Sequence, residues 1–244
     1  MGLPNKPLKA IFPLVVANLG SGLVGPFLGT GFFVRADGTF LTAKHVLEEV
    51  PLRGGEDFAA VLLPGQPTLY RVSHVRFAKQ FDIALARAEG MQDIYPLEIA
   101  TKNAPANDDV LTVEFSGTES RPLEDGRPAM WFNPYYRKGH VICSYRSTYP
   151  EPIATRCLDL SFPALRGASG APVLAERDGS VLGMVLANVE RHLLPAQVER
   201  VDLASDRREE IRYFLPVGKA IGWQHLREFV QSVLSDDVIV PTNE

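Results

Sequence analysis

Short apolar runs separated by clusters of glycine, proline, asparagine and aspartate dominate the chain. Residues 32–34 and 39–42 are two such runs, and Asp37 and Gly38 lie in the turn between them. This arrangement predicts a β-hairpin, because glycine tolerates the positive φ that tight hairpin turns require. The same pattern recurs within residues 173–185. Further strands are predicted at residues 10–17, 58–63, 70–77, 83–86, 110–115, 140–144 and 213–217.

The close spacing of these strands favours an all-β barrel or sandwich. One helix is predicted near the C-terminus, because apolar residues recur there at spacings of three and four. Its stripe comprises Ile221, His225, Leu226, Phe229, Val230 and Val233. The polar stretch 101–109 divides the strands into two groups and is the candidate linker. The charged segment 190–212 is expected to be a solvated loop or helix.

Composition narrows the possible functions of the 244-residue chain. Apolar residues make up 45% and charged residues 22%, which suits a globular protein with a sizeable core. The 25 Lys and Arg against 29 Asp and Glu give a net charge of −4, so no nucleic-acid partner is expected. The two cysteines form no C-x-x-C pair, and the histidines show no metal-ligand spacing. We therefore expect no metal and no cofactor.

No stretch approaches the roughly 18 uninterrupted apolar residues of a membrane span, so no membrane partner is expected. Residues 10–17 weakly resemble a signal peptide, but the run is short and contains Pro13. We interpret it as the first strand and expect a cytoplasmic protein. Cys143 and Cys157 could face each other across a hairpin, but free buried thiols are the favoured interpretation.

Three regions carry residue types that suit nucleophilic catalysis. Their sequences are GTGFFV at 29–34 with LTAKHV at 41–46, FDIAL at 81–85, and GASGAPV at 167–173. They supply His45, Asp82 and Ser169 in that order. A serine hydroxyl is a weak nucleophile at neutral pH and needs an adjacent base. A histidine can take the serine proton and later return it, and a carboxylate can fix the tautomer of that histidine.

These motifs, in this order, resemble those of the chymotrypsin-like (trypsin-like) serine peptidases, and within them the bacterial, HtrA-type branch. The resemblance covers nearly the whole chain. It implies two six-stranded antiparallel β-barrels followed by a C-terminal helix. The first barrel would comprise residues 1–104 and carry His45 and Asp82, and the second would comprise residues 105–244 and carry Ser169.

The resemblance also implies a role for each residue. Ser169 would be the nucleophile, His45 the general acid and base, and Asp82 the orienting carboxylate. The backbone N–H groups of Gly167 and Ser169 would form the oxyanion hole, and glycine at 167 would let its amide face the substrate. The implied activity is that of a serine endopeptidase, which hydrolyses proteins or peptides through an acyl-enzyme.

Two features depart from other members of the family. Digestive relatives have an aspartate before the nucleophile that pairs with a new N-terminus, whereas this chain has Ala168. Activation by that route is therefore not expected. Few residues follow the predicted helix, so we expect no PDZ domain. A regulatory protein partner remains open.

The resemblance locates the base of the P1 specificity pocket at Pro163. The pocket wall would comprise Leu186, Ala187 and Asn188. Because no acidic side chain lies at the base, a small or medium apolar P1 residue is favoured over a basic one. Arg166 and Arg212 keep an acidic P1 residue as an alternative.

Two other functions compete with an endopeptidase. A catalytically silent double barrel could serve as a binding module, although the presence of all three candidate residues argues against it. An esterase could use the same site. Assays on peptides and small esters would separate the enzymes, and labelling by a fluorophosphonate would separate both from a silent module.

Overall fold

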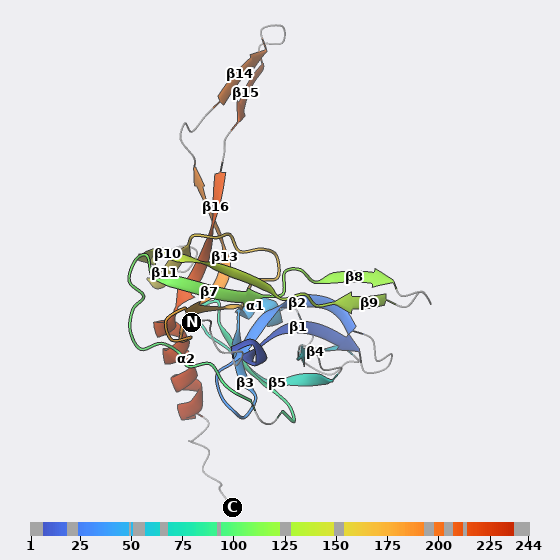
Figure 1. The fold of residues 1–244 in the computed structure, drawn as a ribbon. Coiled ribbons are helices and arrows are strands. Elements are labelled where there is room, and N and C mark those ends of the chain that lie inside the picture. The colour runs from blue at the N-terminus through green and yellow to red at the C-terminus, as the bar shows by residue number, and fades with distance from the viewer. Residues whose placement is uncertain are drawn as a thin grey trace, which may run out of the picture.

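The structure of the protein, a computed structural model, is built mainly from β-strands. It describes residues 7–18, 24–48, 50, 57–63, 68–91, 94–122, 128–148, 154–192, 198–202, 207–211 and 214–236. The strands form two closed antiparallel barrels of six strands each (Figure 1). The predicted all-β fold is therefore confirmed, and a barrel rather than a sandwich is correct.

The first barrel closes in the order β1-β2-β3-β6-β5-β4. Its strands are β1 (Ile11–Asn18), β2 (Val24–Phe33), β3 (Thr39–Thr42), β4 (Asp57–Leu62), β5 (Leu69–Phe77) and β6 (Ala84–Ala88). A 3-10 helix, η1 (Pro7–Ala10), precedes β1, and the short helix α1 (Lys44–Glu48) follows β3. In the predicted β2–β3 hairpin, Gly38 has a φ of +88°, and the Thr39 amide donates to the Asp37 carboxylate at 3.0 Å.

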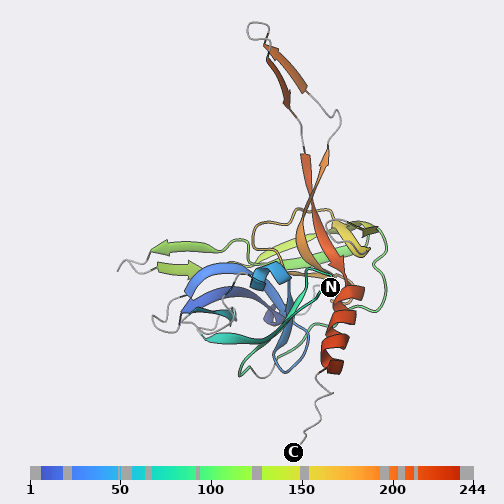
Figure 2. The ribbon, with the colours of Figure 1, turned by 180° about the vertical axis from the view of Figure 1, so that it is seen from behind.

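The second barrel closes in the order β10-β11-β16-β13-β12-β7. Its strands are β7 (Asp109–Glu114), β10 (Tyr135–Ser147), β11 (Thr155–Leu160), β12 (Pro172–Ala175), β13 (Val181–His192) and β16 (Phe214–Gly222). β11 escaped the sequence analysis because Arg156 and Asp159 interrupt its apolar residues. The predicted helix is α2 (Trp223–Asp236), whereas Ile221 belongs to β16. α2 contacts β11, β13 and β16 along one side of the molecule (Figure 2).

Two additional hairpins extend from this core. β8 (Glu119–Pro122) pairs with β9 (Pro128–Trp131), and β14 (Val198–Asp202) pairs with β15 (Arg207–Ile211). The prediction of a loop or helix for residues 190–212 is therefore wrong for 190–192, 198–202 and 207–211, and the rest of that segment lies outside the described residues. The strands β13 and β16 stay paired as far as His192 and Phe214, and the β14–β15 hairpin continues beyond them (Figure 1). A ribbon outside the barrel has no need of a buried face, so its strands lack the apolar alternation that identifies a half-buried strand.

The two cysteines are free, as predicted, but only Cys157 is buried. β10 and β11 pair so that Cys157 lies opposite Tyr145, and Cys143 lies opposite Asp159. This register separates the two thiols along the sheet. The prediction that both are buried is wrong for Cys143, which is exposed.

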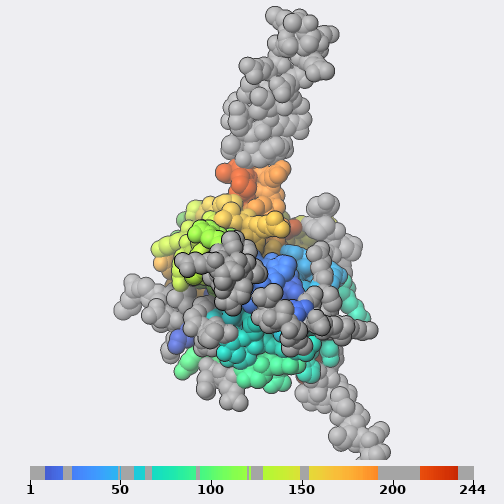
Figure 3. All heavy atoms as spheres, turned by 90° about the vertical axis from the view of Figure 1, so that its right-hand side faces the viewer, coloured from blue at the N-terminus to red at the C-terminus, as the bar shows by residue number. Residues whose placement is uncertain are grey.

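The two barrels pack directly against each other. Figure 3 shows the first barrel, in blue to green, below the second, in yellow-green to red. One buried apolar cluster runs through both barrels and includes Phe12 and Phe33 from the first and Phe115 and Met184 from the second. Hence the interface between the barrels is a continuation of the core.

Phe12 lies at the centre of the aromatic packing in the first barrel. Its ring centroid lies 4.4 Å from that of Phe33 and 5.3 Å from that of Phe40, and its side chain is fully buried. We predict that Phe12→Ala lowers the free energy of unfolding by about 3–5 kcal/mol, because it removes this contact and leaves a cavity. Urea unfolding measures the change. The matched substitution Tyr136→Ala, at an exposed aromatic residue, should change stability by no more than about 0.5 kcal/mol.

Candidate active site

His45 lies in α1, immediately after the end of β3. The next two residues, Val46 and Leu47, are buried in the first barrel and anchor this short helix. The His45 side chain is 48% exposed. The helix therefore presents the imidazole at the surface while its other face holds it in place.

Asp82 lies in the loop between β5 and β6 and binds His45 twice. Its Oδ2 atom is 2.7 Å from His45 Nδ1, and its Oδ1 atom accepts a hydrogen bond from the His45 backbone amide at 3.0 Å. The following residue, Ile83, is fully buried and fixes the loop. One carboxylate therefore sets both the position of the histidine backbone and, through Nδ1, the orientation of its ring.

The environment of Asp82 favours its charged form. Burial alone would raise the pKa of the Asp82 carboxyl. Hydrogen bonds from the His45 ring and from the backbone amides of His45 and Lys44, together with the charge of His45, outweigh burial and lower this pKa below its usual value. Asp82 is thus an ionised acceptor at neutral pH.

Ser169 lies in the loop between β11 and β12, and its hydroxyl donates to the Leu186 carbonyl at 3.1 Å. Leu186 is a bulge residue, because the pairing of β13 with β16 shifts register between Val185 and Ala187. The loop is tied to β13 by a bond of 2.9 Å from the Gly170 amide to the Val185 carbonyl. Within the described part of the chain, the Ser169 amide has no hydrogen-bond acceptor.

The glycines of this loop lie against the first barrel. Gly167 has a φ of +95°, and a Cβ atom there would come within 2.3 Å of the Phe27 ring. Gly170 has a φ of +86°, and a Cβ atom there would come within 2.1 Å of the Thr30 carbonyl and 2.3 Å of Thr42 Oγ1. Only glycine fits at either position, which explains the spacing of glycines around the serine.

A cleft of about 550 Å³ lies between the barrels. From the first barrel it is lined by Lys44, His45, Glu48, Lys79, Phe81 and Asp82, and from the second by Thr155, Cys157, Leu186, Ala187, Lys219 and Ile221. Leu186, which accepts the Ser169 hydroxyl, thus shares the cleft with His45 and Asp82. The candidate base therefore lines a cleft whose wall in the second barrel includes Leu186, the residue that binds the hydroxyl of the candidate nucleophile.

A family model for the trypsin-like peptidase domain matches residues 29–184. The chain belongs to the trypsin-like peptidases. The resemblance inferred from the motifs is thereby confirmed. Peptidases of this kind act on proteins or peptides.

The peptidase is similar to the Rv3671c protease from M. tuberculosis in its active form, with 17% identity and a TM-score of 0.55 over 91% of this chain and 82% of that chain. It is also similar to the inactive form of Rv3671c from M. tuberculosis H37Rv that carries a serine-to-alanine mutation. There the identity is 16% and the TM-score 0.57, over 100% of this chain and 98% of that chain. No curated protein sequence matches the peptidase. At such low identity the structural likeness shows the fold.

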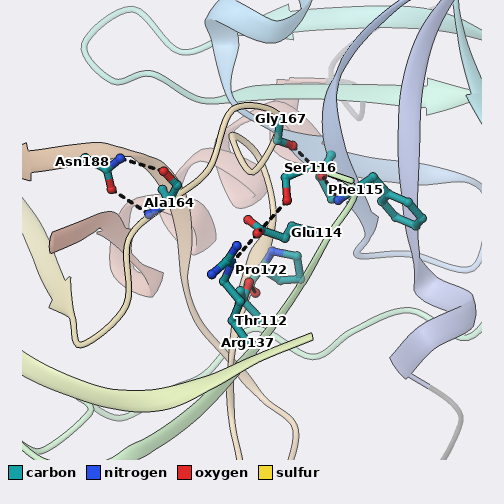
Figure 4. A network of polar contacts seen from close by, with 10 residues as sticks. Thr112, Glu114, Phe115, Ser116, Arg137, Ala164, Gly167, Pro172 and Asn188 are labelled. Carbon is teal, nitrogen blue, oxygen red and sulfur yellow. Dashed lines mark hydrogen bonds and ion pairs between the residues drawn. The ribbon is translucent and has the colours of Figure 1, made fainter. Parts of the chain in front are cut away.

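The residues expected to form the specificity pocket divide into two groups. Leu186 and Ala187 line the cleft. Asn188 reaches across to the nucleophile loop, where its Nδ2 donates to the Ala164 carbonyl and its Oδ1 accepts from the Ala164 amide, each at 2.6 Å (Figure 4). Pro163 is half-buried beside Ala164. The Asn188 side chain therefore bridges the two segments between which a P1 side chain was expected to enter.

Arg166, the cation of the alternative acidic pocket, is exposed, and Arg212 lies outside the described residues. Sequence reasoning missed Thr30, which is fully buried and bonded to the nucleophile loop. The signal for it was a polar residue between two glycines, just before a predicted strand. Among the residues that the structure describes, no group of three or more His, Cys, Asp or Glu side chains could hold a metal ion. None of the helices in these same ranges is long and apolar enough to cross a bilayer.

The lowered pKa of Asp82 predicts a pH-dependent contribution to stability. Since the folded-state pKa lies below the unfolded value of about 3.9, the contribution is fully present above that pH and is lost as the pH falls through the folded-state pKa. We predict that Asp82→Asn lowers the free energy of unfolding by about 1–3 kcal/mol at pH 7, and that the difference from wild type narrows below about pH 4. Urea unfolding between pH 3 and 7 measures this difference. The exposed control Glu89→Gln should give a small difference at pH 7, and a constant effect of Asp82→Asn across the range would contradict the prediction.

Proposed function

We propose that the chain is a serine endopeptidase in which Ser169, His45 and Asp82 act as a catalytic triad. The observation that carries the proposal is the pair of hydrogen bonds that Asp82 accepts from His45, at a cleft whose opposite wall includes Leu186, the acceptor of the Ser169 hydroxyl. This arrangement supplies a weak nucleophile, a base and a group that orients the base.

In the proposed reaction, His45 Nε2 takes the hydroxyl proton of Ser169 while Oγ attacks the carbonyl carbon of the scissile peptide bond. The C–N bond breaks as His45 returns the proton to the departing amine, and an ester remains on Ser169. A water molecule deprotonated by His45 then hydrolyses the ester and restores the serine. Because the Ser169 hydroxyl donates to Leu186 in the structure, the first step requires it to rotate away from that carbonyl.

The backbone N–H groups of Gly167 and Ser169 are proposed to bind the oxyanion. Neither has a hydrogen-bond acceptor among the described residues, so both can donate to a substrate oxygen. Such donors stabilise the charge that develops on the carbonyl oxygen as the serine attacks. The glycine at 167 leaves no side chain between its amide and the substrate.

The proposed P1 residue is small or medium and apolar. The Asn188 side chain, bonded at both ends of its amide to Ala164, narrows the space available to a P1 side chain. The exposed Arg166 is the remaining support for an acidic P1 residue, and no acidic side chain stands at Pro163 to hold a basic one.

We predict that Ser169→Ala lowers kcat on peptide substrates by about 10⁴-fold or more while the fold is retained, because the substitution removes one hydroxyl. A fluorophosphonate probe should label wild type at Ser169, as read by peptide mass spectrometry, and should not label the variant. The control Ser161→Ala, at an exposed serine at the start of the same loop, should be labelled like wild type. Turnover of small esters without peptides would favour the esterase, and a wild type with neither labelling nor turnover would favour a silent binding module.

We predict that Asn188→Gly shifts the P1 preference toward larger residues. The ratio of kcat/KM for a P1 phenylalanine peptide to that for the P1 alanine peptide should rise by about tenfold or more, since it depends on the space that the side chain occupies. Asn133→Gly, at an asparagine whose Nδ2 donates to the Gly117 carbonyl, is the matched control and should leave the ratio unchanged. An equal ratio in the two variants, or a wild type that prefers P1 glutamate, would contradict the assignment.

A further inference from the structure

Thr30 connects the first barrel to the nucleophile loop of the second. It lies on β2 and is fully buried. Its backbone amide donates to the Ser169 carbonyl at 3.0 Å, and its Oγ1 hydroxyl donates to the Gly167 carbonyl at 2.9 Å. Its own carbonyl accepts a hydrogen bond from Thr42 Oγ1 at 2.8 Å, so the threonine is itself held within the first barrel.

These bonds fix the peptide units around the candidate oxyanion hole. The Gly167 carbonyl belongs to the peptide that joins Gly167 to Ala168, and the Ser169 carbonyl belongs to the peptide that joins Ser169 to Gly170. The amide of Ser169 lies in the peptide between them. Because each peptide unit is planar, two restrained units leave the direction of the Ser169 N–H little freedom.

Gly167 needs a restraint from outside the loop. Glycine adopts positive and negative φ with similar ease, so the peptide after Gly167 can rotate at low cost. The Ala168 amide donates to the Leu165 carbonyl at 2.9 Å, which holds one side of that peptide. The Thr30 hydroxyl holds the other side through the Gly167 carbonyl.

The hydroxyl of Thr30 is fixed in turn by the second barrel. Its oxygen accepts a hydrogen bond from the Phe115 amide, at a donor–acceptor distance of 3.4 Å, just after β7. The preceding Glu114 carboxylate is buried and accepts hydrogen bonds from Ser116 and Arg137, which hold this segment (Figure 4). Because the Thr30 oxygen accepts from the Phe115 amide, the hydroxyl proton is directed to the Gly167 carbonyl.

We propose that the Thr30 hydroxyl is a positioning group that, through the peptide between Gly167 and Ala168, holds the Ser169 N–H group in the orientation that binds the oxyanion. The first barrel thereby contributes to transition-state stabilisation as well as supplying His45 and Asp82. The proposal rests on the proposed peptidase function, because it assigns a role within that site.

The test compares Thr30→Val with Thr30→Ser. Valine keeps the shape of the side chain and removes the hydrogen bonds of the hydroxyl, whereas serine keeps the hydroxyl. Thr30→Val should lower kcat by about 10- to 100-fold with KM changed less than about threefold, because the lost contact acts in the transition state. Thr30→Val should also weaken the binding of a peptide aldehyde inhibitor by a similar factor, because the inhibitor's adduct places an oxyanion in the same hole. Thr30→Ser should return kcat to within about threefold of wild type.

Thr112→Val is the matched control. Thr112 is equally buried, and its hydroxyl donates to the Pro172 carbonyl at 2.6 Å within the second barrel. This variant should keep kcat within about threefold of wild type. If Thr30→Val does not fold, Thr30→Ala takes its place, and circular dichroism verifies the fold of each variant.

Several outcomes would overturn the proposal: a wild-type kcat in Thr30→Val, a loss that Thr30→Ser does not restore, or an equal loss in Thr112→Val. Hydrogen exchange of residues 165–171 provides a readout independent of turnover, and it should rise in Thr30→Val and remain at the wild-type level in Thr112→Val. If wild type cleaves no peptide, the proposed function fails, and hydrogen exchange alone then tests whether Thr30 positions the loop. Unchanged exchange in Thr30→Val would then overturn the role of Thr30.

Discussion

The docking of the nucleophile loop onto β2 is the contact on which the candidate site depends. Two carbonyls of the loop accept hydrogen bonds from Thr30, and two glycines approach the first barrel more closely than any side chain would allow. His45 and Asp82 belong to the first barrel and Ser169 to the second, so neither barrel contains the site alone. The apolar cluster that runs through both barrels stabilises their packing without fixing a direction. The hydrogen bonds from Thr30 then fix how the nucleophile loop is aligned on β2.

The charged and the hydrogen-bonding groups of the site are also divided between the two barrels. Asp82 is held in its ionised form by hydrogen bonds from a single neighbouring helix, so the orienting group is complete within the first barrel. The candidate oxyanion donors are backbone amides of the second barrel, whose direction depends on contacts across the interface. A substitution in the first barrel can therefore affect either the base or the oxyanion hole, through different residues.

Much of the fold was predictable because its signals are local. Asp37 and Gly38 identified a hairpin, and the apolar runs at 39–42 and 83–86 identified the strands beside His45 and Asp82. The β14–β15 hairpin was not predictable, because strands outside a barrel carry no apolar alternation. Nor could the exposure of Cys143 or the role of Thr30 be predicted, since both depend on pairing between distant segments. The sequence places Thr30 in a motif but does not reveal that its partner lies at Gly167.

The order of the strands along the chain has a consequence for how the protein is made. The first barrel is complete once β6 has been synthesised, but β16, which closes the second barrel between β11 and β13, comes last among the barrel strands. Domains generally fold from the N-terminus as synthesis proceeds, and pairing between distant strands is slow. A nascent chain on the ribosome therefore carries its histidine and aspartate, and even its serine, before the barrel that orients the serine can close.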